Sequence, residues 1–246
     1  MKEFVDFIGR ALGAFFLFVA LMVVSCDKVP SEGDEVADQD PITGYVNLSA
    51  SSTANCYIIN QGGSYRISAV RGNDASDVLQ TARTAEVLWE SFGSSLSIGA
   101  GALIKSVIYK DGYICFKTND HFKKGNAVVA AKDESGKILW SWHIWMTDQP
   151  QEHVYKNDAG TLMDRNLGAT SAAPDEYSVG LMYQWGRKDP FMGPSSFDQN
   201  REFAKSSITW PTPVASDPST GTVEYAIANP TTFITYDENN KGWYYT

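Results

Sequence analysis

Histidines, cysteines and paired carboxylates could give this sequence catalytic or metal chemistry, but their spacing favours neither. The three histidines are His121, His143 and His153, and none lies in an HExxH pattern or beside a zinc-type cysteine pair. His143 and His153 could meet Asp148, but a hydrogen-bonded structural histidine is the simpler interpretation. The sequence has no GxSxG turn and no phosphate loop, and its spacing singles out no carboxylate pair. We therefore expect no catalytic residue, metal or cofactor, and predict that the protein is not an enzyme.

Acylation is the one chemistry that the sequence does predict, and it falls on Cys26. A charged stretch of ten residues is followed by an apolar run from Ala11 to Val24 and by small Ser25. This is the layout of a secretory signal peptide, here residues 1–25. The apolar run has 14 residues, fewer than the roughly 20 that span a bilayer. Val23-Val24-Ser25-Cys26 resembles the bacterial lipobox, which implies a lipid such as palmitate on Cys26 as a membrane anchor. A plain N-terminal membrane helix with an incidental cysteine is the alternative.

Residues 26–43 are predicted to be an acidic, flexible tether. The stretch 27–40 has six acidic residues, one lysine and no aromatic residue, and it contributes −5 of the formal charge of −9. Acidic residues behind the lipidated cysteine resemble the surface-export signal of Bacteroides-type lipoproteins, which implies exposure on the cell outer membrane. A solvated linker with no sorting role is the alternative. The net acidity argues against nucleic acid as a partner.

Residues 44–150 have the pattern of an Ig-like antiparallel β-sandwich, with short strands separated by turn signals. Gly62-Gly63 suits one hairpin, Asp111-Gly112 a tighter one, and Ser135-Gly136 the centre of a third connecting loop. Val87 and Trp89 alternate onto one face. The candidate strands are 55–60, 64–70, 86–91, 103–109, 113–118, 127–131 and 138–146.

Cys56 and Cys115 are the two thiols of the predicted body. Cys56 alternates in phase with Ile58 and is expected to point inward, whereas Cys115 is out of phase with Ile114 and Phe116 and is expected to point outward. We predict two unpaired thiols. A disulfide remains the alternative in an oxidising compartment.

The strand at 138–146 carries the clearest alternation in the sequence. Its predicted core face holds Trp140, Trp142 and Ile144, and we expect Trp89 and Phe116 in the same core. Its other face holds His143 and Trp145. We expect that pair to pack beneath a neighbouring domain, and a carbohydrate-stacking platform is the alternative.

Two strings mark residues 151–246 as a second region. They are Leu162-Met163-Asp164-Arg165-Asn166-Leu167-Gly168-Ala169-Thr170 and Gly180-Leu181-Met182-Tyr183-Gln184-Trp185-Gly186-Arg187-Lys188-Asp189-Pro190-Phe191. They resemble the start of the Fibrobacter succinogenes major paralogous domain, and residues 140–151 resemble the linker before it in Bacteroides-type fimbrillin-like surface lipoproteins. The resemblance implies a partial α+β domain, C-type-lectin-like in fold, with no established catalytic role. From the residues alone, 181–185 suit a helical turn ended by Gly186, and Asp164 suits a local ion pair with Arg165.

The resemblance also leads us to expect an incomplete C-terminal domain, because the family continues with a CPxGWxVP-like string that this sequence lacks. The expected function is a non-catalytic surface lipoprotein, adhesion- or fimbria-associated or structural. The alternative is a glycan-binding surface lipoprotein that serves polysaccharide capture. The expected partners are the membrane, through Cys26, and a surface protein or glycan. A cluster of exposed aromatic residues would favour the glycan, and fully buried aromatic residues the adhesion function.

Overall fold

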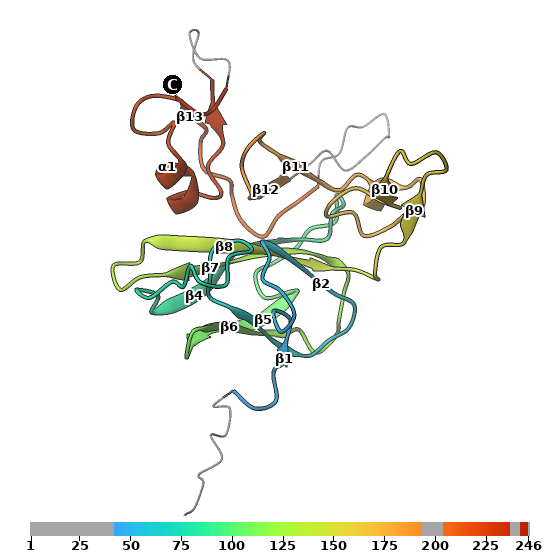
Figure 1. The fold of residues 1–246 in the computed structure, drawn as a ribbon, viewed down its shortest axis with the longest axis horizontal. Coiled ribbons are helices and arrows are strands. Elements are labelled where there is room, and N and C mark those ends of the chain that lie inside the picture. Colours follow the sequence, from blue (N-terminus) through green and yellow to red (C-terminus); the bar gives the residue numbers. More distant parts are fainter. Residues whose placement is uncertain (1–41, 193–203, 237–241, 246) are drawn as a thin grey trace, which may run out of the picture. The chain divides into compact units, whose positions relative to one another are not determined.

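The first part of the body is built from eight strands in two four-stranded sheets. The computed structural model describes residues 42–192, 204–236 and 242–245. The strands are β1 Val46–Asn47, β2 Cys56–Ile59, β3 Ser64–Ser68, β4 Thr84–Ser91, β5 Ile104–Lys110, β6 Tyr113–Thr118, β7 Gly125–Lys132 and β8 Ile138–Met146. One sheet has the order β1-β3-β6-β5 and the other β2-β8-β7-β4 (Figure 1). The chain is thus mainly β, as the sequence predicted.

Two of the predicted hairpins form because their turn residues favour them. Strands β5 and β6 pair antiparallel across Asp111 and Gly112, whose φ values of 48° and 81° are the positive angles that a tight hairpin turn requires. Strands β7 and β8 pair antiparallel across the loop that contains Gly136, with φ 86°. Both connections confirm the predictions from turn chemistry.

The hairpin predicted at Gly62-Gly63 is wrong. Strand β2 pairs parallel with β8, and β3 pairs with β6 in the other sheet, so the two glycines lie in a crossing between sheets. Strand β1 also pairs parallel with β3. The sheets are therefore mixed, not purely antiparallel as predicted. Local alternation shows that a segment is a strand, but the choice of neighbour depends on contacts distant in sequence.

Both sheets contribute to one hydrophobic core. Ile67 and Phe116 come from the first sheet, and Val129, Trp142 and Ile144 come from the second; all five are buried. Phe116, Trp142 and Ile144 confirm the predicted core positions. Trp140 is only partly buried at the edge of this core, where its indole Nε1 donates a hydrogen bond to Asn55 at 3.1 Å.

Trp89 is buried but does not face that core, contrary to the prediction. Val87 lies opposite Val129, a core residue, whereas Trp89 lies opposite Val128 after a register shift between Val87 and Trp89. A β-bulge inserts one residue and so reverses the side-chain alternation that follows it. Trp89 instead packs against Trp210, with ring centroids 5.5 Å apart.

The bulge also places a buried carboxylate where it fixes the loop before β5. Glu90 is fully buried, and its two oxygens accept hydrogen bonds from the backbone amides of four consecutive residues. The amides of Gly101 and Ala102 donate to Oε2 at 2.6 and 3.2 Å, and those of Leu103 and Ile104 to Oε1 at 2.9 and 2.6 Å. A buried carboxylate is tolerated when hydrogen bonds replace its hydration, so we assign Glu90 a structural role.

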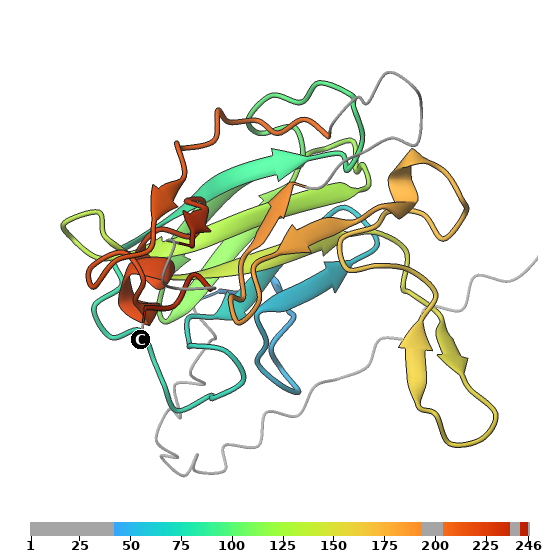
Figure 2. The same ribbon diagram turned by 90° about the horizontal axis from the view of Figure 1, so that it is seen from above.

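The second part of the body contains short elements linked by long loops. They are β9 Glu152–Val154, β10 Thr161–Met163, a 3-10 helix Glu176–Ser178, β11 Leu181–Tyr183, β12 Pro190–Met192, β13 Val214–Ala215, α1 Val223–Ala228 and β14 Ile234–Thr235. Each pair of strands here forms its own two-stranded sheet. Thr222 caps α1, since its hydroxyl accepts a hydrogen bond from the amide of Tyr225 at 3.1 Å. Figures 1 and 2 show the β9–β10 hairpin projecting away from the two large sheets.

The helical turn predicted at 181–185 is wrong, because these residues form β11 and the turn that follows it. Leu181 pairs with Met192 and Tyr183 with Pro190 across an antiparallel hairpin. Leu181 also packs against Gly168, where an added Cβ would lie 2.5 Å from the leucine side chain. A pattern of four or five residues suits a helix or a strand equally, so packing decided between them.

The second part packs on the outer face of β8, which confirms the interpretation of His143 and Trp145 as covered residues. Trp145 Nε1 donates to the carbonyl of Ala169 at 3.0 Å, and Ser141 Oγ donates to Asp189 Oδ1 at 2.6 Å. All three outward residues of β8 named here, Ser141, His143 and Trp145, are buried. Asp40–Thr246 forms one compact unit, so the predicted boundary at residue 150 crosses buried contacts.

The N-terminal predictions fall mostly outside the described residues. Cys26, the signal peptide 1–25 and nearly all of the tether 26–43 lie in the undescribed part. Ile42 is described and buried, with 3% of its surface exposed, so the ordered body begins before residue 44. An apolar side chain next to a core favours burial, and the acidic composition of the preceding stretch does not prevent it. Among the described residues, no helix is long and apolar enough to cross a bilayer.

Candidate ligand-binding site

The first of the two strings quoted above, residues 162–170, is tied to the segment that follows β8. The side chain of Arg165 is only 3% exposed, and its guanidinium contacts Asp164 at 2.7 Å and Asp148 at 3.0 Å. The pair with Asp164 was predicted. The hydrogen bond from Arg165, and a further one from Lys124, lower the pKa of Asp148 well below its ordinary value. The charges of this cluster are matched internally, which indicates a structural clamp.

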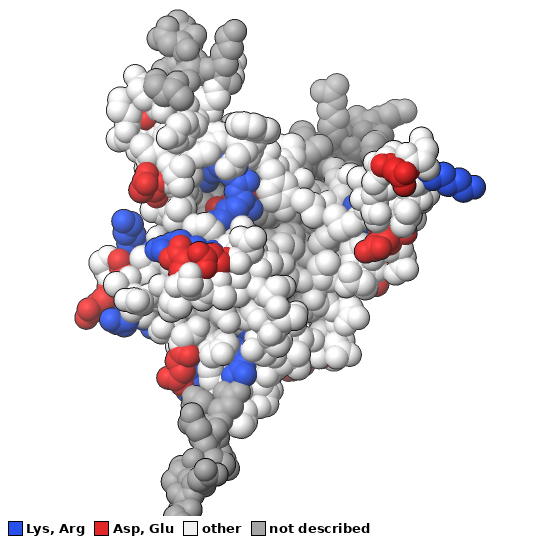
Figure 3. All heavy atoms as spheres, viewed as in Figure 1, with Lys and Arg blue, Asp and Glu red and all other residues white. Residues whose placement is uncertain are grey.

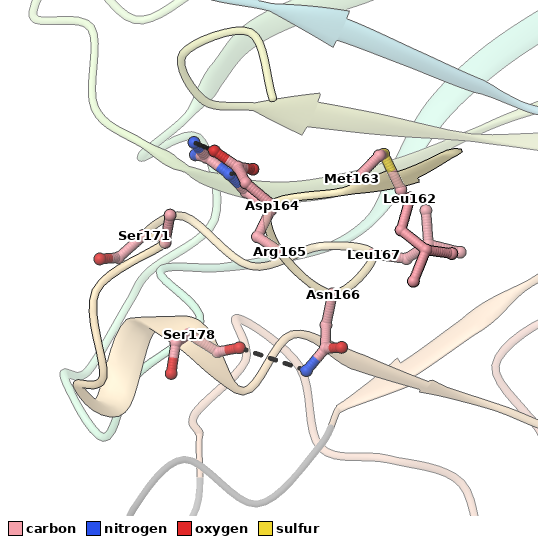
Figure 4. A pocket seen from close by; sticks show the side chains of 9 residues that line it. Leu162, Met163, Asp164, Arg165, Asn166, Leu167, Ser171 and Ser178 are labelled. Carbon is pink, nitrogen blue, oxygen red and sulfur yellow. Dashed lines mark hydrogen bonds and ion pairs between the residues drawn. The ribbon is translucent and has the colours of Figure 1, made fainter. Parts of the chain in front are cut away.

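A hollow of about 470 Å³ lies beside this clamp, as Figure 4 shows. Leu162, Met163 and Leu167 line one side of it. Asn166 donates to the backbone carbonyls of Ser178 and Val179 at 3.4 and 3.2 Å. The arginine, the aspartate and the amide already have protein partners, and the remaining lining is a mixture of aliphatic side chains and serines. We assign no chemistry to it.

The side chains of the second string, residues 180–191, also make structural contacts, except for that of Trp185. Gln184 exchanges two hydrogen bonds with the backbone of Ile234, at 2.8 and 3.1 Å. Lys188 Nζ donates to Ser141 Oγ and Asp189 Oδ1, both at 2.6 Å, and both charged side chains are largely buried. These contacts give each polar side chain a structural partner.

Trp185 is the exception, because 93% of its surface is exposed. It lies in the turn between β11 and β12, next to Gly186, whose φ of 81° favours glycine. Its carbonyl accepts a hydrogen bond from the indole Nε1 of Trp243 at 2.5 Å. An indole that buries almost nothing contributes little to folding. It becomes informative where it belongs to a larger exposed apolar patch.

Trp185 borders a groove of about 580 Å³ that is lined mainly by aromatic and apolar side chains. The groove joins the β11–β12 hairpin to the segment around β14 and to the C-terminal residues. Tyr236 is 70% exposed, and Phe233 is 39% exposed. The aromatic groove, as we call it, is formed by Met182, Tyr183, Gln184, Trp185, Phe191, Phe233, Ile234, Thr235, Tyr236, Gly242 and Trp243.

A buried chain of hydrogen bonds joins Cys56, His143 and Asn126, in the order of a nucleophile, a base and an orienting amide. Cys56 Sγ lies 3.2 Å from His143 Nδ1, and His143 Nε2 lies 2.9 Å from Asn126 Oδ1. Asn126 Nδ2 donates to the carbonyl of Gly168 at 2.9 Å, which leaves its oxygen to accept from a neutral imidazole. Sequence spacing could not reveal this cluster, because its members lie on three different strands of one sheet, β2, β7 and β8.

The electrostatics of this cluster oppose catalysis. Burial raises the pKa of the Cys56 thiol to about 12 and lowers the pKa of His143 to about 3. The pair is therefore a neutral thiol and a neutral imidazole, whereas a cysteine nucleophile needs a depressed pKa and access to substrate. We assign the cluster a structural role at the contact between β8 and the second part.

Neither Cys56 nor Cys115 forms a disulfide, in agreement with the prediction. Cys115 is out of phase with the core residues, as expected, although it is buried. The expectation for Cys56 was wrong: Tyr57 and Ile59 face the core, so Cys56 faces His143 and the second part. The second part of the body covers that face of the sheet, so both faces of the sheet are buried. Alternation alone does not show which of two buried faces a side chain points to.

His121 and His153, by contrast, are exposed. Within the described ranges, no three His, Cys, Asp or Glu side chains are grouped so as to hold a metal ion. The residues that sequence reasoning missed are those of the aromatic groove, above all Trp185. The sequence did contain a signal for the exposure of Trp185. The tryptophan precedes a glycine and three charged residues, and a polar turn of this kind rarely holds a core residue.

Comparisons with known proteins leave the family open. No family model matches the chain, and no match to it is found among the curated proteins or the solved structures.

Proposed function

We propose that this protein is a lipid-anchored cell-surface protein of the outer membrane, without enzymatic activity, that captures glycans through the aromatic groove. Support for the anchor comes from the signal-like N-terminus and Cys26. The observation that carries the binding function is Trp185, exposed over 93% of its surface at the border of the aromatic groove. Exposed aromatic residues were expected for a glycan-binding protein and fully buried ones for an adhesion protein. The exposed aromatic cluster therefore favours the glycan.

The physical basis is the fit between aromatic rings and sugar rings. The apolar faces of a pyranose can stack on aromatic rings, and rigid aromatic side chains lose little conformational entropy on binding. The groove is open and mostly apolar, with a few polar groups, which is the usual composition of a small-ligand site.

The test is binding of the protein to an array of oligosaccharides, with Trp185→Ala as the variant. Because Trp185 is almost fully exposed, the substitution should leave the fold intact and weaken binding by about tenfold or more, as for other exposed aromatic anchors. Tyr155→Ala is the matched control, since Tyr155 is also exposed (44%) but lies on the projecting hairpin, outside the groove. A protein that binds no glycan, or a Trp185→Ala variant that binds as well as wild type, would contradict the proposal.

The β9–β10 hairpin favours adhesion to a protein as a second candidate function. Its residues are exposed throughout, including Val154 at 66% and Leu162 at 58%. Among the strands of the described residues, its two strands pair only with each other. An isolated two-stranded hairpin is marginally stable in water, so apolar side chains on it suit a protein partner. Leu162→Asp should abolish cell adhesion and leave glycan binding unchanged. Adhesion that survives the substitution would exclude this candidate.

A further inference from the structure

We infer that the glycan held in the aromatic groove carries a carboxylate, as a uronic acid does, and that Arg187 selects it. This inference rests on the proposed glycan-binding function and adds the chemical class of the ligand. It depends on a buried guanidinium whose hydrogen bonds in the described part of the chain all go to uncharged acceptors.

Arg187 is 8% exposed. Its Nη1 donates to Gln184 Oε1 and to the carbonyl of Thr232 at 2.6 and 2.8 Å. Its Nη2 donates to the carbonyls of Asn229 and Ala226 at 3.1 and 3.5 Å. All four acceptors are uncharged, and within the described residues Nε has no hydrogen-bond partner. The hydrogen bonds therefore hold the guanidinium in place without neutralising it.

The neighbouring lysine does not share this situation. Lys188 is paired with Asp189 at 2.6 Å, so the two charges largely cancel. Asp189 lies near enough to Arg187 to favour its charged form, but burial outweighs this effect and lowers the pKa of Arg187. The three side chains together keep a net positive charge in surroundings where a charge is poorly hydrated.

This charge lies directly behind the aromatic groove. The Arg187 guanidinium carbon is 5.2 Å from the ring centroid of Phe191 and 5.9 Å from that of Trp243, and both rings line the groove. Trp243 also borders a smaller hollow of about 160 Å³ whose walls include Arg187, Lys188 and Asp189, two cations and one anion. Figure 3 shows basic atoms inside a hollow of the surface beside the part that carries α1.

Local charge, not net charge, should decide ligand preference. The chain carries −9 overall, but the stretch 27–40 contributes −5 and the first 26 residues are neutral in sum, so residues 41–246 carry only −4. At physiological ionic strength, solvent-exposed charges more than about 8 Å apart are largely screened, and buried charges are screened less. A carboxylate at the Trp243 end of the groove, beside the smaller hollow that Arg187 lines, would lie near a buried and poorly hydrated cation. A neutral sugar has no charge to interact with that cation.

The experiment compares two probes that differ only in charge: tetragalacturonic acid and the same oligosaccharide with its carboxyl groups reduced to alcohols. Binding of both to the protein is measured by calorimetry at low and at physiological salt. We expect the acid to bind about tenfold or more tightly than the reduced form, with a preference that shrinks as salt rises.

Arg187→Gln removes the buried charge and should abolish the preference while the reduced probe still binds. Arg83→Gln, at an exposed arginine outside the groove, is the matched control and should keep it. If Arg187→Gln does not fold, the preference of the wild-type protein for the acid, and the salt dependence of that preference, test the carboxylate inference.

The outcomes separate the two claims. Equal binding of both probes, lost in Trp185→Ala, would overturn the carboxylate inference and leave glycan capture standing. Binding of neither probe, nor of any other oligosaccharide on the array, would overturn the proposed function and the inference with it.

Discussion

Acidification from about pH 7 to about pH 5 should destabilise this protein through a single side chain, His143. Its ring is fully buried between Cys56 and Asn126, and burial lowers its pKa from 6.5 to about 3. In the folded protein the imidazole stays neutral down to about pH 3. In the unfolded chain it takes up a proton once the pH falls below 6.5.

The sign and the size of the effect follow from this difference. Between pH 6.5 and 3 the unfolded state binds more protons than the folded state, so the free energy of unfolding decreases as the pH falls. The contribution of His143 is complete above pH 6.5. At pH 5 the loss is about 2 kcal/mol, and it approaches about 4 to 5 kcal/mol near pH 3, since each pKa unit corresponds to about 1.4 kcal/mol.

The pH window separates His143 from the carboxylates. Hydrogen bonds and ion pairs lower the pKa values of Asp148 and Asp164 from 3.8, so their stabilising contribution is present above that value and is lost only in more acidic solution. Between about pH 5 and pH 7 these carboxylates stay ionised in both states. A loss of stability in this window therefore reports on the buried histidine.

The assay is urea unfolding followed by tryptophan fluorescence at the two pH values. His143→Gln should be less stable than wild type near pH 7, because it disturbs the hydrogen bonds to Cys56 and Asn126, but it should show no loss from pH 7 to pH 5. His121→Gln, at an exposed position, should keep the loss. Equal wild-type stability at both pH values, or an undiminished loss in His143→Gln, would refute the reasoning.

The remaining predictions concern the carboxylate under β5, the core and the anchor. Glu90→Gln should lower the free energy of unfolding by about 2 to 5 kcal/mol, because its amide nitrogen would face buried N–H donors; Glu86→Gln, at a partly exposed pair with Lys132, should cost less than about 1 kcal/mol, and equal losses would contradict a special role for Glu90. Trp142→Ala should cost about 3 to 5 kcal/mol in the same urea assay, and a loss below about 1 kcal/mol would mean that Trp142 does not fill the core. Cys26→Ala should abolish metabolic labelling with a palmitate analogue, and labelling that persists would rule out Cys26 as the lipidated residue.

Local sequence was enough to predict seven of the eight strands in the first part, all except the two-residue β1. Alternation over nine residues predicted β8, and Asp111-Gly112 predicted the β5–β6 hairpin, because strand periodicity and turn geometry depend on neighbouring residues alone. The same reasoning predicted that Trp142 and Ile144 would be buried. It also singled out His143 and Trp145 as needing a cover.

Only the tertiary structure decided what depends on residues far apart in the chain. The parallel pairing of β2 with β8, the bulge that turns Trp89 away from the core, and the meeting of Cys56 with His143 each follow from long-range packing. The aromatic groove joins Trp185 to Tyr236 and Trp243 across some fifty residues of sequence, so no local pattern could reveal it. Sequence periodicity shows that a face is apolar, whereas what covers that face, or leaves it open to a ligand, depends on where the rest of the chain packs.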